Sequence, residues 1–298
     1  MEKIIIETEV NERIDSYLSK ITEYSRSKIT KMIEQEAILV NDKKAKNSYV
    51  LKQDDVITIK EIEEEQMSIE PEDIPLDIVY EDEDVIVVNK PNGMVVHPAI
   101  GNNHGTLVNA LLYYSKSLSD INGEFRPGIV HRIDADTTGL LMVAKNNKAH
   151  EILADELSKK ETTRKYIALV WGVIKEDTAT IDAPIGRDIN DRKKMSVTNI
   201  NSKDAVTHLK VLKRFKEVTL IELQLETGRT HQIRVHMNYI GHPVVNDPVY
   251  GKKKIIDITG QCLHAKTIGF NHPTKNKYME FDSELPECFI NILNMFDE

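Results

Sequence analysis

Residues 128–139 read Gly-Ile-Val-His-Arg-Ile-Asp-Ala-Asp-Thr-Thr-Gly, and this stretch decides how the rest of the chain is interpreted. The apolar pair Ile129 and Val130 leads into it, and a longer apolar run, 140–144, leads out of it. Short apolar flanks around a polar centre that ends in glycine predict a strand, a loop and a second strand. Loops held by strands often carry catalytic side chains, although a plain polar surface hairpin has the same pattern.

The composition is that of a globular protein in a reducing compartment. The chain has 298 residues, of which 40% are hydrophobic, and this length suggests one large or two smaller domains. No apolar run approaches the roughly 18 residues of a membrane span, and the N-terminal apolar run is too short for a signal peptide. Two cysteines, Cys262 and Cys288, provide neither a disulfide framework nor a zinc quartet. We therefore expect a cytoplasmic protein without a membrane partner.

The acidic residues are concentrated in one part of the chain. The net charge is -9, but the segment 61–84 contains 12 acidic residues and no Lys or Arg. Outside that segment, 36 acidic residues face 39 basic ones. A nucleic-acid partner for the remaining surface is therefore permitted by the charge, although charge alone does not establish it.

Residues 1–60 predict a small separate unit. Apolar residues recur at helical spacing in a first run, Ile14, Tyr17, Leu18 and Ile21, and in a second run, Ile29, Met32 and Ile33. Ser25 precedes the second run and is a suitable N-cap residue. Short strands are expected at 37–41 and 56–60, separated by a turn at 42–44. The order is thus two helices followed by short strands.

This N-terminal unit resembles the S4 RNA-binding domain. The resemblance rests on Arg13-Ile14-Asp15-x-x-Leu18, Ser25-Arg26-Ser27-Lys28, Ile38-x-Val40-Asn41 and Asp54-Asp55-x-Ile57. It implies phosphate contacts on the second helix and the following loop, at Arg26, Lys28, Lys31, Lys43 and Lys44. On charge alone these cations would equally form a solvated face. Many family members have a glycine before the first strand, where this chain has Gln35-Glu36, and an acid there would weaken RNA binding.

An acidic linker and a larger domain follow. Residues 61–75 combine a glutamate-rich run with Pro71 and Pro75, which disfavour regular structure. From residue 76 we expect a strand at 85–91, a hairpin turn at Asn92-Gly93 with 94–98 pairing back, and a helix capped by Thr106. Further strands cluster without regular βα alternation. This favours an α+β fold, with a mixed or antiparallel sheet in the domain 76–298.

The central stretch resembles the active-site motif of the RluA/RluD-type RNA pseudouridine synthases, His-Arg-Leu-Asp-x-x-Thr-Ser-Gly. The essential aspartate of that motif falls on Asp134, whereas Asp136 falls on a variable position. Sequence chemistry alone does not choose between the two carboxylates. Ile133 for Leu and Thr138 for Ser are mild departures that leave the chemistry unaffected.

Two further segments extend this resemblance. Residues 227–236, Thr-Gly-Arg-Thr-His-Gln-Ile-Arg-Val-His, match the segment whose first arginine pairs with the catalytic aspartate, which implies that role for Arg229. A guanidinium can hold a carboxylate ionised through two parallel hydrogen bonds. Lys165-Tyr166 matches the strand whose tyrosine stacks on the target base. Taken alone, Tyr166 would be a core tyrosine and Arg229 a surface arginine.

The remaining polar residues of these motifs are assigned to RNA contacts: His131, Arg132, His231 and Arg234. A metal is not expected, because His231 and His236 are five residues apart and no His-Glu-x-x-His is present. The chain also lacks a P-loop and a Gly-x-Gly-x-x-Gly segment, so no cofactor is expected.

The resemblance implies an enzyme that isomerises uridine in RNA to pseudouridine, with large-subunit ribosomal RNA or its assembly particle as the expected partner. Transfer RNA is the alternative substrate, and the protein is expected to be a monomer. A non-catalytic RNA-binding or ribosome-assembly protein is a second alternative. A third is a metal-dependent phosphoesterase that uses His131, Asp134 and His231.

Overall fold

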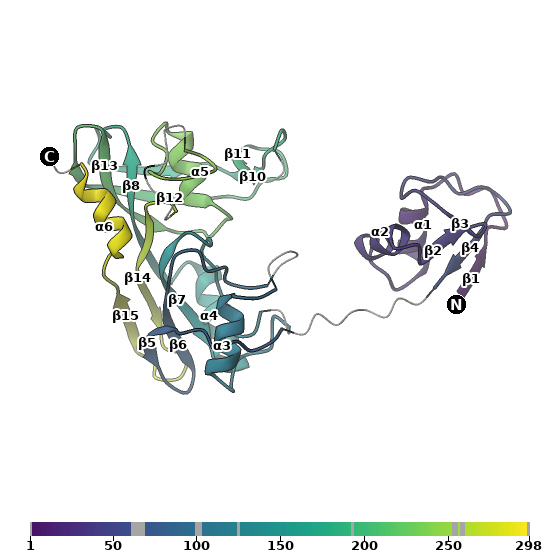
Figure 1. The fold of residues 1–298 in the computed structure, drawn as a ribbon, viewed down its shortest axis with the longest axis horizontal. Coiled ribbons are helices and arrows are strands. Elements are labelled where there is room, and N and C mark those ends of the chain that lie inside the picture. Colours follow the sequence, from purple (N-terminus) through teal and green to yellow (C-terminus); the bar gives the residue numbers. More distant parts are fainter. Residues whose placement is uncertain are drawn as a thin grey trace. The chain divides into compact units, whose positions relative to one another are not determined.

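The computed structural model divides the chain into two compact units, Met1–Met67 and Ser68–Glu298 (Figure 1). It describes residues 2–60, 69–98, 103–123, 126–191, 194–251, 256 and 260–296, without the side chains of Glu2 and Ser27. Most of the glutamate-rich part of the expected linker, 61–68, lies outside the described residues. No helix among the described residues is long and apolar enough to cross a membrane.

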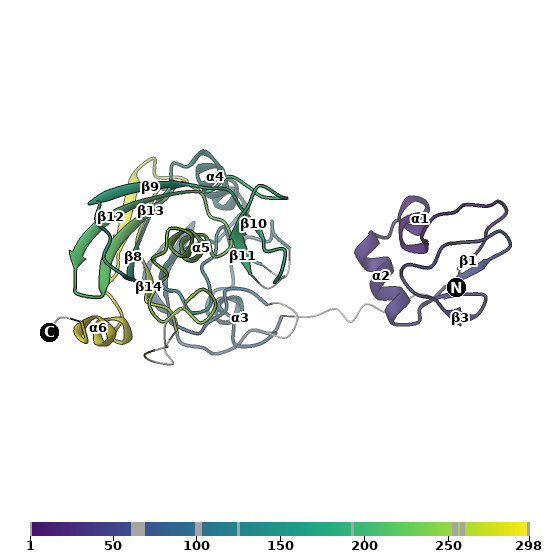
Figure 2. The ribbon, with the colours of Figure 1, turned by 90° about the horizontal axis from the view of Figure 1, so that it is seen from above.

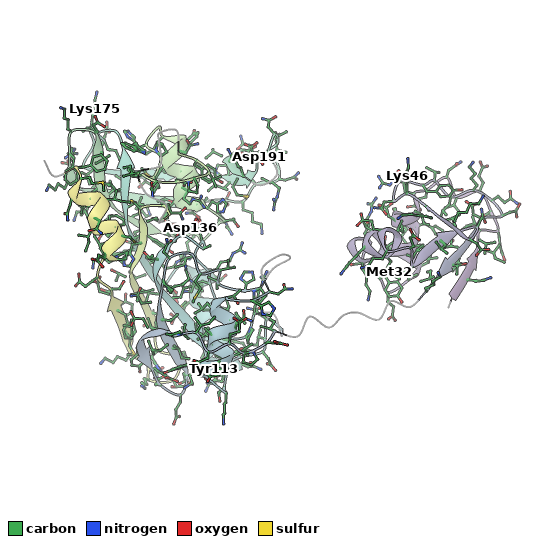
Figure 3. All side chains as sticks on the ribbon, in the orientation of Figure 1. Met32, Lys46, Tyr113, Asp136, Lys175 and Asp191 are labelled. Carbon is green, nitrogen blue, oxygen red and sulfur yellow. The ribbon has the colours of Figure 1, made fainter. Side chains whose placement is uncertain are left out.

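The first unit is a four-stranded sheet covered by two helices. Its elements are β1 (Glu2–Ile5), α1 (Ile14–Ile21), α2 (Arg26–Glu34), β2 (Ile38–Val40), β3 (Lys43–Lys44) and β4 (Val56–Ile59). The sheet order is β1-β4-β2-β3. The apolar faces of the helices pack on it, for example through Ile14, Leu18 and Met32, of which Met32 is labelled in Figure 3. Ser25 caps α2 by accepting a hydrogen bond from the Lys28 amide, as expected.

The second unit is built on a nine-stranded mixed sheet. Eight strands follow the order β5-β6-β7-β14-β8-β13-β12-β9, and β15 pairs with β14. The bounds are β5 (Asp77–Glu81), β6 (Val85–Lys90), β7 (Thr138–Ala144), β8 (Thr163–Trp171), β9 (Thr178–Asp182), β12 (Val206–Arg214), β13 (Val218–Leu225), β14 (Leu263–Asn271) and β15 (Tyr278–Asp282). Among the described strands of this sheet, only the β7–β14 pair is parallel. The expected mixed α+β architecture is therefore confirmed.

Helices cover both faces of this sheet, and the strands alternate between the two cores. One core contains Tyr166, Ala168 and Val170 of β8 together with α3 (Leu107–Tyr114) and α5 (Gln232–Tyr239). The opposite side of β8 packs against α6 (Glu287–Asn294), and the opposite side of β7 against α4 (Asn147–Lys159). Because both faces are covered, β7 is buried throughout its length, and its residues from Leu140 to Ala144 are all apolar. The strands β8, β13, β12 and β9 curve around α5 (Figure 2).

Two local expectations were wrong. The chain before the central loop makes only an isolated bridge, between Ile129 and Val143, and not a strand. Residues 94–98 do not pair back on β6, because β5 and β7 already occupy both its edges. Instead, the carbonyl of Val95 accepts a hydrogen bond from the amide of Leu107 at the start of α3.

A short hairpin completes the unit beside α5. It consists of β10 (Ile185–Arg187) and β11 (Met195–Val197), which pair with each other outside the main sheet. The contacts between β11 and α5 place the hairpin next to that helix.

Candidate active site

Asp134 lies in the loop before β7, and the side chains around this loop hold its backbone in place. His131 Nε2 accepts a hydrogen bond from the Met142 amide over 3.1 Å. Lys90, only 1% exposed, donates from Nζ to the carbonyl oxygen of Ala135 over 2.7 Å. Burial lowers the pKa of Lys90 to about 7. The position of Asp134 is therefore set by the strands β6 and β7, which carry Lys90 and Met142.

The end of the loop is fixed by close approach to β14. Gly139 has a φ of +109°, and a side chain there would meet the backbone of Ala265. Thr138 and His264 share a hydrogen bond of 2.7 Å between Oγ1 and Nδ1. Only glycine tolerates both the positive φ and the contact, so the parallel pairing of β7 with β14 depends on it.

Arg234 is the partner of Asp134. Its Nη1 donates to Asp134 Oδ2 over 2.8 Å, while Nε and Nη2 donate to the two carboxylate oxygens of Asp247 over 2.7 and 2.9 Å. Burial raises the pKa of Asp247, but the Arg234 guanidinium outweighs this and holds that pKa below its usual range. Asp247 thus fixes the guanidinium in a geometry that leaves Nη1 directed at Asp134.

The expected pairing of Arg229 with Asp134 was wrong. Arg229 Nε donates to the backbone carbonyl of Asp204 over 2.8 Å. Arg229 lies in the turn before α5, whereas Arg234 lies within α5 and is 5% exposed. Helix phase therefore directs Arg234 into the site, and Arg229 remains in the pocket wall.

Tyr166 lies on β8, between β13 and β14. It is 7% exposed and aligned with Leu223 on one side and Ala265 on the other. Burial raises its pKa, and the nearby charge of Asp134 acts in the same direction. The phenol is therefore neutral and can offer its ring as an apolar surface.

Asp134, Tyr166 and Arg234 line one pocket. Its empty space is about 520 Å³, part of it open to solvent. The other wall residues that matter below are Arg132, Arg164, Gly228, Arg229 and His231. The pocket thus combines a carboxylate with an excess of guanidinium groups.

His231 stands beside the carboxylate in a left-handed conformation. Its φ is +56°, and it occupies the N-cap position of α5. Its Nδ1 shares a hydrogen bond of 2.9 Å with the Tyr250 hydroxyl, and its Nε2 is 4.0 Å from Asp134 Oδ1. Burial lowers the pKa of His231 despite the nearby carboxylate. A neutral ring in this position favours shaping of the pocket over binding of a phosphate.

His131 and Arg132 differ in what they offer to RNA. Burial lowers the pKa of His131 to about 3, and its Nε2 is engaged by the backbone as described above. His131 therefore has no charge to offer to a phosphate, and its engaged nitrogen does not suit a catalytic metal site. Arg132 is exposed at the pocket rim and donates from Nη2 to Thr230 Oγ1 over 2.9 Å.

The second carboxylate of the loop points elsewhere. Asp136 lines a small separate hollow with Asn92 and Gly260, and it is labelled in Figure 3. Asp134 alone of the two shares the pocket of Tyr166 and Arg234. The geometry therefore separates two carboxylates that sequence chemistry could not.

The cations expected to contact RNA in the N-terminal unit lie on α2 and β3. Arg26, Lys31, Lys43 and Lys44 are exposed, and Lys28 is half-buried. Arg26 Nε donates to Asp15 over 3.0 Å, Lys44 Nζ to Glu36 over 3.0 Å, and Lys28 lies over the Tyr24 ring. Two of these cations are thus already engaged by carboxylates.

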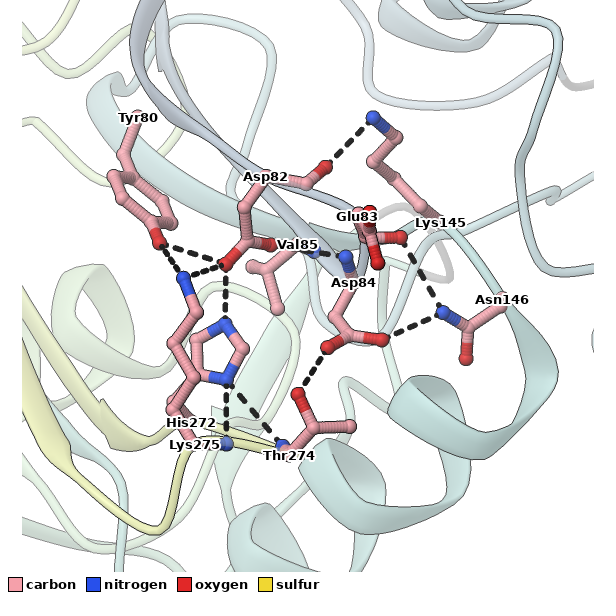
Figure 4. Close-up of polar contacts among 10 residues, drawn as sticks. All are labelled: Tyr80, Asp82, Glu83, Asp84, Val85, Lys145, Asn146, His272, Thr274 and Lys275. Carbon is pink, nitrogen blue, oxygen red and sulfur yellow. Dashed lines mark hydrogen bonds and ion pairs between the residues drawn. The ribbon is translucent and has the colours of Figure 1, made fainter.

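One group of potential metal ligands occurs among the described residues, away from this pocket. It comprises Asp82, Asp84 and His272 (Figure 4). Lys275 Nζ lies 2.7 Å from Asp82, and His272 Nε2 lies 2.6 Å from the same oxygen. A metal ion here would need Asp82 as a ligand, but the Lys275 ammonium group already occupies that carboxylate. The cluster therefore does not fit a metal site. The cluster instead ties the β5–β6 turn to the β14–β15 turn.

Comparison with known proteins identifies a family for each of the two units. The family profile described as RNA pseudouridylate synthase matches residues 84–239. The chain belongs to this family. The S4 domain profile matches residues 12–57, so the synthase carries an N-terminal S4 domain. It acts on RNA as an isomerase that converts uridine to pseudouridine.

Relatives resemble the synthase over most of its length. "Uncharacterized RNA pseudouridine synthase YlyB" of Bacillus subtilis is 53% identical, covering 96% of this chain and 95% of that protein. "Ribosomal large subunit pseudouridine synthase D" of Escherichia coli O6:H1 is 42% identical, covering 98% and 92%. The solved structure of "Human RNA Pseudouridylate Synthase Domain Containing 1" is 26% identical, with a TM-score of 0.59 over 79% of this chain and 97% of that one.

Several site residues were not assigned a role from the sequence. Asp247 and Tyr250 lie further along the chain than residues 227–236, and nothing in their spacing indicated a contact with α5. Lys90 lies in an apolar strand run, where a lysine was itself an unusual feature. Arg164 directly precedes the Lys165-Tyr166 pair and was assigned no role.

Proposed function

We propose that the synthase isomerises one or more uridines of large-subunit ribosomal RNA. The observation that carries the chemistry is the Asp134–Arg234 pair facing Tyr166 in one pocket. The ribosomal substrate is supported by the relatives named for the large ribosomal subunit. We further propose that the protein is a monomer in the cytoplasm.

Access to the uridine requires that it leaves the RNA stack. Turning a base out costs a few kcal/mol, which stacking on an aromatic ring and backbone contacts offset. Tyr166 is the proposed stacking surface. With the base on that ring, the sugar faces Asp134.

Asp134 is the proposed catalytic residue. The N1–C1′ bond breaks, the uracil turns, and C5 bonds to C1′; the proton on C5 leaves and N1 gains one. An ionised carboxylate can attack C1′ or remove a sugar proton to give a glycal, and carboxylates act comparably in glycoside cleavage. Arg234 holds Asp134 in one orientation in either route.

Tyr166 and the S4 domain complete the proposal. The buried Tyr166 phenol, or water beside it, takes the C5 proton in the last step. In the S4 domain, Arg26, Lys28, Lys31, Lys43 and Lys44 contact phosphates and hold the substrate near the catalytic unit, a contribution that weakens with salt.

Tritium release from [5-³H]uridine-labelled ribosomal RNA tests this function. We expect release by the wild type in the presence of chelator and none by Asp134→Asn, which should still bind the RNA. Measurable turnover by Asp134→Asn would overturn the assignment of the aspartate. Release from bulk transfer RNA, without release from ribosomal RNA, would overturn the substrate and keep the chemistry.

A further inference from the structure

Arg164 is a buried arginine for which the described residues provide no carboxylate partner. It lies on β8, two residues before Tyr166, and is 8% exposed. Its Nη2 donates to the backbone carbonyl of Glu226 at 3.3 Å, and its buried Nε has no hydrogen-bond partner in the described structure. A Cβ at Gly228 would come within 2.8 Å of its Nη1. The guanidinium therefore fits here because residue 228 is a glycine.

This arrangement is costly in the free protein. A buried charge without a partner loses hydration that nothing replaces. The contrast with Arg234 is direct, because that equally buried arginine is held by two carboxylates. An unsatisfied guanidinium inside a binding site indicates an anion that arrives with the ligand.

A second hollow meets the active-site pocket at Arg164. Its empty space is about 1240 Å³, and the two hollows share Arg132, Arg164, Gly228 and Arg229. Arg126 and Lys160 add two more cations to its wall. The carboxylate of Glu226 is already held there, by Lys160 over 2.7 Å and by His208 over 2.8 Å. The junction between the hollows is therefore strongly cationic.

We propose that Arg164 binds a backbone phosphate adjoining the target uridine, where the RNA strand passes from the second hollow into the active-site pocket. This rests on the proposed function, since the sugar at Asp134 brings its flanking phosphates to the pocket mouth. The planar fork of the guanidinium matches two phosphate oxygens. Arg164 is then a positioning residue that sets the depth of the sugar beside Asp134.

RNA binding by the full chain tests the phosphate contact. The Asp134→Asn background prevents conversion, and the probe is a large-subunit ribosomal RNA transcript titrated at several KCl concentrations. Adding Arg164→Gln should weaken binding about 10- to 100-fold. It should also reduce the slope of log Kd against log[KCl] by about one, the signature of one lost phosphate contact.

Arg214→Gln is the matched control. Arg214 lies at the far end of β12, outside both hollows, and pairs with Asp177. Its loss should leave the affinity within about threefold and the salt slope unchanged. Arg164→Lys keeps the charge without the fork, so an intermediate loss of affinity is expected.

Thermal unfolding of the free protein separates a binding role from a structural one. Because Arg164→Gln removes an uncompensated buried charge, the variant should unfold at the same or a higher temperature than the wild type. An unchanged affinity and salt slope would overturn the proposal. Weaker binding with an unchanged slope would also overturn it, since it indicates either a contact with a uracil carbonyl or a loss of fold.

The proposed activity and the phosphate site fail separately in these assays. If the wild type releases no tritium but Arg164→Gln reduces the slope of log Kd against log[KCl], the proposed reaction is wrong and the phosphate site stands. If tritium is released and the slope does not change, the reaction stands and the phosphate site is wrong.

Discussion

Arg234 joins two carboxylates, donating to Asp134 from Nη1 over 2.8 Å and to Asp247 from Nε and Nη2. Asp247 has no exposed side-chain surface, whereas Asp134 is 24% exposed. The same guanidinium is thus anchored on the buried side and presents its third nitrogen on the open side. This arrangement holds the proposed catalytic carboxylate in one orientation before RNA arrives.

We expect Arg234→Lys to lower the single-turnover rate about 100-fold or more. An ammonium group cannot hold Asp247 with two bonds and reach Asp134 at the same time. The measurement is tritium release at saturating RNA. Arg229→Lys is the matched control and should change that rate less than about threefold, because Arg229 does not contact Asp134. An equal decrease of the single-turnover rate in the two variants would indicate that Arg229 pairs with Asp134 during the reaction.

Tyr166→Phe separates stacking from proton transfer. The phenyl ring keeps the apolar surface of the pocket, so RNA affinity should stay within about threefold. Removal of the hydroxyl should slow turnover about 100-fold or more if that group handles the C5 proton. Tyr166→Leu should lose affinity as well. A Tyr166→Phe variant with the wild-type rate would assign the proton to water.

The cluster around Asp82 predicts loss of stability in acid. Burial raises the pKa of Asp82, but hydrogen bonds from Lys275, Tyr80 and two backbone amides outweigh it and hold that pKa well below its ordinary value. A depressed folded-state pKa contributes stability above the unfolded-state value, about 4, and this contribution is lost as the pH falls below it. The free energy of unfolding, measured with urea between about pH 6 and pH 3, should fall more steeply in the wild type than in Asp82→Asn.

The same substitution gives a magnitude at neutral pH. Asp82→Asn should lower the free energy of unfolding by about 1–3 kcal/mol, since Lys275 and His272 lose a charged acceptor. The control is Asp155→Asn, which breaks an exposed pair with Lys159 and should leave the free energy of unfolding nearly unchanged. Similar costs for the two variants would contradict a structural role for the cluster.

Glu36→Gly should strengthen RNA binding by the S4 domain. Glu36 has a φ of +59° and accepts a hydrogen bond from Lys44. Glycine adopts this conformation without the strain of about 1 kcal/mol that other residues carry. Both Glu36→Gly and Glu36→Ala release Lys44, so both should raise affinity about twofold or more, while only the glycine variant should raise the melting temperature. Unchanged affinity in both variants would exclude Lys44 as an RNA contact.

Much of the architecture was predictable because its signals are local. The helical spacing around Leu18 and Met32, the cap at Ser25 and the apolar run after Gly139 each determine structure over a few residues. The pairing of residues 94–98 with β6 was mispredicted, because the Asn92-Gly93 signal is local while the occupation of both edges of β6 by β5 and β7 is not.

The sequence by itself determined the family, the order of two helices and short strands in the S4 domain, and the loop that carries Asp134. Only the tertiary structure decided which arginine meets that aspartate. Arg229 and Arg234 lie in one segment, and the start of α5 at Gln232 directs the second of them toward Asp134 and Asp247. Likewise, only the packing of β8 beneath the loop of Gly228 leaves Arg164 buried without a carboxylate among the described residues. Contacts between residues so far apart in the sequence depend on how the strands of the whole sheet pair and pack. The spacing of residues within one segment contains no information about that pairing.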